Sequence, residues 1–112
     1  MAGTWVTNIQ HFFCDSIDIP LPDLPRPALR LLHYFLTIIE DVTMRDDPTV
    51  PEATNVRCRR RPGRKPCTGF IVAAVQKNND LIIHWECPVC SDRGILYGWR
   101  WTDWDHSDDE DI

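Results

Sequence analysis

The chain has 112 residues, of which 43% are hydrophobic and 26% are charged. This composition is typical of one globular domain and excludes an intrinsically disordered protein. No apolar run reaches the roughly 20 residues that are needed to span a bilayer. Residues 1–20 contain Asp15 and Asp18 and lack the basic start and apolar stretch of a signal peptide. We therefore expect a cytoplasmic protein without a membrane partner, in which clustered cysteines stay reduced and favour a metal.

The net charge of −5 hides a strong segregation of charge along the chain. Residues 1–56 carry eight acidic and three basic side chains, and residues 102–112 carry six acidic and no basic ones. Residues 57–101 between them carry nine basic and three acidic side chains. An anionic partner would therefore be attracted to the middle of the chain.

The first half of the chain predicts mainly helix. Aromatic and aliphatic residues recur at helical spacing in residues 5–14, which predicts a short helix there. Prolines between residues 20 and 27 predict an extended segment, and Pro27 suits the first turn of a following helix. In residues 28–44 apolar side chains recur every three or four positions, so we expect an amphipathic helix that packs on the rest of the domain. Residues 46–55 contain two prolines and predict a connector.

The second half predicts a small antiparallel sheet. Residues 70–75 and 81–86 have the composition of strands and flank the turn 77–80, which predicts a hairpin. A third strand is expected over residues 95–101, where Ile95, Tyr97, Trp99 and Trp101 alternate onto one face, with Trp104 shortly after. Such a stripe favours a core face that receives the helix 28–44. A stacking platform for unpaired bases is the alternative interpretation.

Four cysteines in this half have the arrangement of metal ligands. Cys87 and Cys90 form a C-x-x-C pair directly after a predicted strand, and such a turn lets two thiolates converge on one ion. Cys58 and Cys67 lie one hairpin upstream, so that two ligand turns flank antiparallel strands as in a zinc ribbon. Eight residues separate Cys58 from Cys67, where ribbon pairs usually leave two to four, so this insert must bulge out and return. Pro62-Gly63 is a plausible centre for its turn.

Other uses of these cysteines stay open. A C-P-x-C redox pair, disulfides in an exported protein, and reduced cysteines packed as apolar side chains each fit part of the pattern. His84 could replace one cysteine, although a cross-strand contact is the simpler interpretation. His11 and Cys14 form an H-x-x-C pair, for which local packing is the simpler interpretation. Four thiolates would close the coordination sphere of Zn²⁺, and no catalytic motif is found, so we expect a structural zinc and no enzymatic activity.

Half of the twelve basic residues form one loop between the first two cysteines and just before them. The loop comprises Arg57, Arg59, Arg60, Arg61, Arg64 and Lys65. The planar fork of arginine suits phosphates, so this basic loop (residues 57–65) predicts nucleic-acid binding. The acidic tail folding back onto the loop, and guanidinium groups bonding to thiolates or carbonyls, are the internal alternatives. A protein-interaction adaptor that uses the helix 28–44 or the Trp-rich strand 95–104 is an alternative function.

Across nearly its full length the chain resembles a bacterial family of small, uncharacterised proteins. The resemblance is carried by the opening W-V-T-N-I, the prolines-then-helix segment Pro20 to Ile39, the patterns C-R-R-R-P-G-R-x-P-C and W-x-C-P-x-C-x-D-x-G, and the closing G-W-x-x-T-x-W-D. It implies a zinc-ribbon-like protein, although Ser91 stands where such ribbons commonly have glycine. We therefore expect an α+β fold with three parts: a helical N-terminal segment (1–56), a zinc-ribbon-like module with a small antiparallel sheet (57–104) and an acidic tail (105–112).

Overall fold

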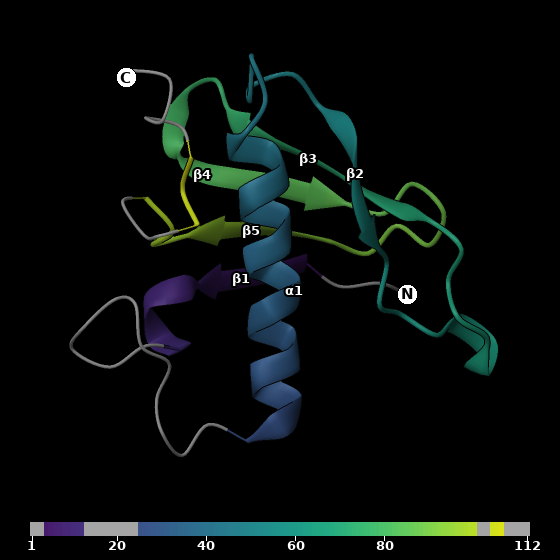
Figure 1. Ribbon diagram of the computed structural model, residues 1–112. Helices are drawn as coiled ribbons and strands as arrows, with labels where there is room; N and C mark the ends of the chain where they lie inside the picture. The colour runs from purple at the N-terminus through teal and green to yellow at the C-terminus, as the bar shows by residue number, and fades with distance from the viewer. Residues whose placement is uncertain (1–3, 13–24, 101–103, 107–112) are drawn as a thin grey trace.

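The computed structural model describes residues 4–12, 25–100 and 104–106, and its fold is one α-helix packed on a five-stranded mixed sheet (Figure 1). The elements in chain order are β1 (Thr4–Asn8), the 3-10 turn η1 (Ile9–Phe12), α1 (Arg26–Thr43), β2 (Glu52–Arg57), the 3-10 turn η2 (Pro62–Arg64), β3 (Phe70–Gln76), β4 (Asn79–Glu86) and β5 (Arg93–Tyr97). The strand order across the sheet is β1-β5-β4-β3-β2. The expected α+β class is therefore confirmed.

The N-terminal part of the prediction is wrong, because the described residues begin with the strand β1 and the helix α1 follows later. β1 pairs with β5 in parallel, while the other neighbouring strands are antiparallel, so the sheet is mixed and not purely antiparallel. A short helix is expected over residues 5–14, but residues 5–8 pair with residues about 90 positions away, and that pairing decides their conformation. Residues 9–12 form the 3-10 turn η1. Segment 13–24, with Cys14, Pro20 and Pro22, lies outside the described residues.

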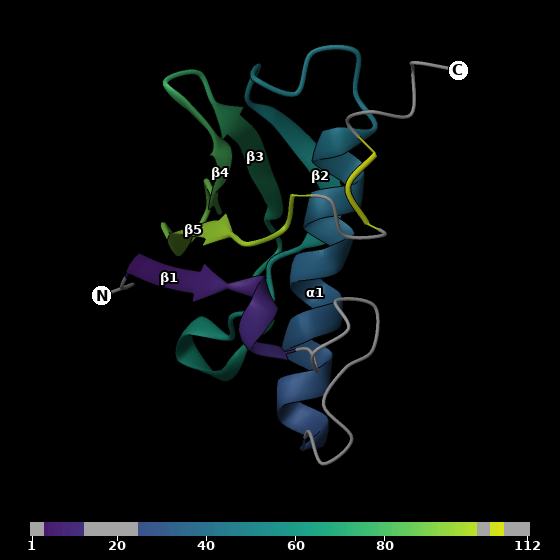
Figure 2. The same cartoon turned by 90° about the vertical axis from the view of Figure 1, so that its left-hand side faces the viewer.

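The helix α1 covers one face of the sheet, as the side view in Figure 2 shows. Pro25 is extended with φ −61° and ψ 153°, the helix begins at Arg26, and Pro27 lies in its first turn as expected. The buried apolar face of α1 comprises Leu32, Phe35, Leu36, Ile38, Ile39 and Val42. It packs into one core with buried side chains of the sheet, where the rings of Phe35 and Trp85 lie 6.0 Å apart. Within the described part of the chain, no helix has the length and apolar character to cross a membrane.

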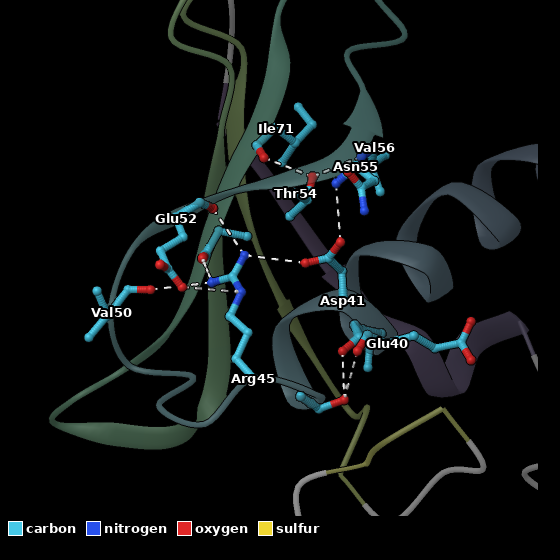
Figure 3. A network of polar contacts seen from close by, with 12 residues as sticks. Glu40, Asp41, Arg45, Val50, Glu52, Thr54, Asn55, Val56 and Ile71 are labelled. Carbon is cyan, nitrogen blue, oxygen red and sulfur yellow. Dashed lines mark hydrogen bonds and ion pairs between the residues drawn. The ribbon is translucent and has the colours of Figure 1, made fainter.

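The predicted connector contains the start of an additional strand, β2, which closes the sheet at one edge. Figure 3 shows how Arg45, just after α1, joins this edge to the helix. Its guanidinium donates to the carbonyls of Ala73 at 2.7 Å, Glu52 at 3.0 Å and Val50 at 3.2 Å. Asp41 completes the network, because its carboxylate lies 3.5 Å from Arg45 and accepts the N–H of Asn55 at 3.1 Å. The contacts of Arg45 and Asp41 thus hold β2 in place, and no local sequence pattern predicts them.

The aromatic stripe of the third predicted strand is placed differently from the prediction. β5 ends at Tyr97, and Leu96 is the fully buried residue between the partly exposed Ile95 and Tyr97. Gly98 then adopts a φ of +76°, and Trp99 beyond it is fully buried. The left-handed glycine breaks the alternation, so Trp99 does not share a face with Ile95 and Tyr97. Trp101 lies outside the described residues.

Candidate metal centre

The four cysteines of the two pairs come together at one end of the sheet. Cys58 and Cys67 lie in the connection from β2 to β3, and Cys87 and Cys90 lie in the connection from β4 to β5. Since β2, β3, β4 and β5 are successive antiparallel neighbours, both connections leave the sheet at the same end. The first three cysteines are buried and Cys90 is partly buried. The topology of the sheet therefore places all four predicted ligands at the same end of the fold.

The geometry of the sulfur atoms suits one metal ion. All four Sγ atoms lie within 4.8 Å of one another. The Sγ atoms of Cys58 and Cys90 are 3.6 Å apart, as are those of Cys67 and Cys87. A disulfide needs about 2.05 Å, whereas Zn–S bonds of about 2.3 Å set neighbouring sulfurs of a regular tetrahedron about 3.8 Å apart. The thiols thus have the spacing of ligands around a shared centre, and each close contact joins one cysteine from each pair.

The two cysteine turns have matching backbone hydrogen bonds despite their different lengths. The N–H of Cys58 donates to the carbonyl of Gly69 at 2.9 Å, and the N–H of Cys87 donates to that of Asp92 at 2.7 Å. In both turns the acceptor lies two residues after the second cysteine. In the longer turn, the N–H of Cys67 also donates to the carbonyl of Arg60 at 2.9 Å. Residues 61–66 are therefore an insertion, and the hydrogen bond between Cys67 and Arg60 joins its two ends. The rest of the first turn resembles a C-x-x-C turn.

The turn of this insertion lies where the sequence predicts it. η2 spans Pro62–Arg64, and both Gly63 and Arg64 have a left-handed backbone with φ of 62° and 68°. In the second turn Ser91 takes the position at which glycine is common in such ribbons, and its φ is +66°. Serine thus adopts the conformation that glycine would adopt there, and the turn keeps its shape.

Gly69 is required by the packing of the cysteines themselves. A Cβ at this position would lie 2.6 Å from the Sγ of Cys87, closer than real Cβ contacts occur. The backbone N–H of Gly69 also donates to the Sγ of Cys67 at 3.5 Å. This residue therefore contacts one thiol of each pair, a role that a search for ligand spacing does not reveal.

The thiols differ in how readily they ionise. Burial raises the pKa of Cys58 well above its ordinary value, and burial also raises the pKa of Cys90. Burial opposes ionisation of Cys87 as well, but hydrogen bonds from the backbone N–H groups of Cys90 and Val89 and from the thiols of Cys67 and Cys90 together outweigh it, so the pKa of Cys87 is lowered. A cation bound among the thiols would compensate the thiolate charge and favour the deprotonated forms.

The basic loop is exposed beside this cluster. All six of its basic side chains are exposed, and among the described residues no carboxylate forms an ion pair with them. The guanidinium of Arg57 lies 5.5 Å from the ring centre of Phe70, and that of Arg59 lies 5.8 Å from that of Tyr34. Arg61 donates to the carbonyl of Arg64 at 3.1 Å within the loop. The described residues thus show one internal carbonyl contact and no guanidinium contact to a thiol.

The described part of the acidic tail, residues 105–106, lies at the C-terminal end of α1. The N–H of His106 donates to the hydroxyl of Thr43 at 3.0 Å, and its ring lies 3.4 Å from the carboxylate of Glu40. Figure 1 shows this segment beside the C-terminal end of α1, away from the connection between β2 and β3. The other acidic residues of the tail lie outside the described residues.

Histidine does not join the cluster. His84 is exposed on β4, and the candidate ligands among the described residues are the four cysteines. Asp92 is a residue that the sequence interpretation missed. It is 2% exposed, and its carboxylate accepts the indole N–H of Trp5 at 3.1 Å. The sequence signal for Asp92 is its place in the pattern W-x-C-P-x-C-x-D-x-G, two residues after Cys90.

Comparisons with known proteins return no relative: no family model, no curated protein and no solved structure matches this chain.

Proposed function

We propose that the protein is a zinc-ribbon-like module in which a structural Zn²⁺ bound by Cys58, Cys67, Cys87 and Cys90 holds the basic loop in place for binding nucleic acid. The observation that carries the metal is the convergence of four thiols within 4.8 Å at the ends of two hairpins. Thiolates are the soft ligands that Zn²⁺ takes in closed structural sites. When bound, the ion would compensate the thiolate charge and tie the two hairpins together.

The proposed module is not catalytic. Four thiolates fill the coordination sphere, whereas a catalytic zinc keeps a position for water or substrate. Three of the four cysteines are buried and Cys90 is partly buried, as is typical of a site that serves the fold.

Metal content tests the site. We expect one zinc per chain in the purified protein, and Co²⁺ substitution should give the thiolate charge-transfer absorption of a tetrahedral four-cysteine site. Cys90→Ser should lose the metal or bind it far more weakly, because one soft ligand is replaced by a hydroxyl. Cys14→Ser serves as the matched control and should keep full occupancy. Zinc retained at full affinity by Cys90→Ser would refute the assignment of ligands.

The basic loop supports nucleic acid as the partner. Its charges are exposed, and they are concentrated on a segment that both cysteines of the first pair anchor. Arginine binds phosphate oxygens in a bidentate way, and clustered arginines release counterions from nucleic acid on binding. We infer that the metal contributes indirectly, by reducing the entropy that the loop would lose on binding.

Binding should depend on the loop and on salt. We expect the variant with Arg59, Arg60 and Arg61 replaced by alanine to bind labelled DNA and RNA oligonucleotides at least tenfold more weakly in a fluorescence anisotropy titration, with a shallower salt dependence. A variant with Arg30, Lys77 and Arg93 replaced by alanine removes the same charge from exposed positions outside the loop. Equal losses in the two variants would mean that binding follows net charge alone and would remove the loop from the proposal.

We do not favour the protein-interaction alternative. The apolar face of the predicted helix is buried against the sheet, and Trp99 of the Trp-rich segment is fully buried. These side chains stabilise the core, and a partner would have to displace it to contact them.

A further inference from the structure

A cleft of about 600 Å³ lies next to the metal centre, between the basic loop, the first half of α1 and the edge strand β1. Its lining includes three arginines of the basic loop on one side. Aromatic side chains form much of the rest, namely Trp5, Tyr34, Phe35 and Trp85. The volume is within the range of sites for small molecules and single nucleotides. A cleft with this combination suits a ligand that is both flat and anionic.

Trp5 is held at the cleft as a fixed aromatic surface. It is 39% exposed, although its indole N–H is anchored to the buried Asp92. Trp5 also packs closely over Gly94, because a Cβ on Gly94 would lie 2.8 Å from the Cβ of Trp5. An exposed indole that is already oriented loses little rotational freedom when a ring stacks on it.

The remaining polar groups of the cleft suit an anionic ligand. Burial raises the pKa of Tyr34, with further contributions from Cys58 and Asp92, so its hydroxyl stays neutral at physiological pH. The indole nitrogen of Trp85 is buried and has no hydrogen-bond partner among the residues that the structure describes. Asp92, the acidic residue of the lining, is engaged by Trp5. Guanidinium groups therefore dominate the charge at the mouth of the cleft.

We propose that this cleft binds one unpaired nucleobase, stacked on Trp5, while Arg59, Arg60 and Arg61 hold the adjacent phosphates. The proposal rests on the nucleic-acid binding proposed above and specifies its ligand as a single strand, because a base inside a duplex is not free to enter the cleft. Stacking on an indole is tolerant of base identity, so the preference is for strandedness and not for sequence.

The metal centre supports this binding site through Asp92. The carbonyl of Asp92 accepts the N–H of Cys87 at 2.7 Å, and its carboxylate holds Trp5. The cysteine turn therefore fixes one anchor of the stacking surface, while the other cysteine turn carries the arginines. Both sides of the cleft depend on the same ion.

The test is a fluorescence anisotropy titration of the zinc-loaded full chain with labelled oligothymidylate and with a duplex of the same length. We expect the single strand to bind more tightly. Trp5→Leu should weaken single-strand binding roughly tenfold and leave duplex binding unchanged. Trp5→Phe should retain most of the affinity, because it keeps a ring. Val6→Ala is the matched control on the same strand, since Val6 is 65% exposed and does not line the cleft, and it should bind like the wild type.

The outcomes separate this inference from the proposed function. If single strand and duplex bind equally well and both lose affinity when the loop arginines are replaced, the cleft does not bind an unpaired base. The proposal that the loop binds nucleic acid would then still stand. Unchanged single-strand binding by a zinc-loaded Trp5→Leu would also overturn it. Absence of binding to every oligonucleotide would overturn both proposals.

Discussion

Gly69 is a position where the absence of a side chain serves the metal centre directly. The space for its Cβ is taken by the Sγ of Cys87, which belongs to the other cysteine turn. Any larger residue must displace a ligand of the opposite pair, so the effect of a substitution would reach the centre without altering a ligand.

We expect Gly69→Ala to weaken zinc binding roughly 10- to 100-fold, the range found for residues that support metal ligands. Competition with a chromogenic chelator measures the change. The adjacent Thr68→Ala is the control, because Thr68 is exposed and should keep its affinity. An unaffected Gly69→Ala variant would show that the sulfur has room to move.

At the scale of elements, the junction between α1 and the sheet depends on Arg45. Its guanidinium satisfies carbonyls of β2, β3 and the preceding loop, and its side chain is only 11% exposed. Removing it would leave several acceptors without a donor in a partly buried place, which costs more than the loss of a surface ion pair.

We expect Arg45→Ala to lower the free energy of unfolding by about 2–3 kcal/mol, measured by urea denaturation of the zinc-loaded protein. Arg45→Lys should recover little of this, since the carbonyls are bonded by two separate guanidinium nitrogens and an ammonium has only one nitrogen. Arg30→Ala, on the exposed face of α1, should change stability by less than about 0.5 kcal/mol. Full recovery by lysine would mean that charge, and not geometry, is what the network needs.

At the scale of the whole molecule, one apolar core and the proposed zinc site would share the stabilisation of a small fold. The core joins α1 to the sheet and includes the buried Cys58, Cys67 and Cys87. Domains of this size have about 5–15 kcal/mol of net stability, whereas a structural zinc contributes about 10–16 kcal/mol of apparent binding free energy in small peptides. The binding free energy of the proposed ion would therefore be comparable with the net stability of such a domain.

We expect a strong chelator to unfold the protein or to lower its Tm markedly, as followed by circular dichroism. Adding zinc back should restore the native spectrum. Cys90→Ser should be less stable from the start and insensitive to the chelator. A zinc-loaded wild type whose Tm did not change on complete removal of the metal would contradict a structural role for the ion.

Local patterns predicted α1 and the hairpin of β3 and β4, because helical periodicity and turn residues act over a few positions. They also grouped the four cysteines whose Sγ atoms the fold brings within 4.8 Å of one another, since ligand spacing around a hairpin is a local property. β1 could not be recognised, because its pairing with β5 joins distant parts of the chain. The roles of Gly69, Asp92 and Trp5 likewise depend on contacts across the fold. Side chains in such contacts carry no periodic signature in the sequence.

The hydrogen bond from Cys67 to Arg60 makes the segment 61–66 separable from the centre that it adjoins. Excising these six residues would leave Cys58-Arg59-Arg60-Cys67, with the same spacing as the second pair. We therefore expect that the length and sequence of the insertion can change, by evolution or by engineering, without a change in the arrangement of the four cysteines. Related proteins with this architecture would change their ligand by changes in residues 61–66 alone, while the fold stays the same.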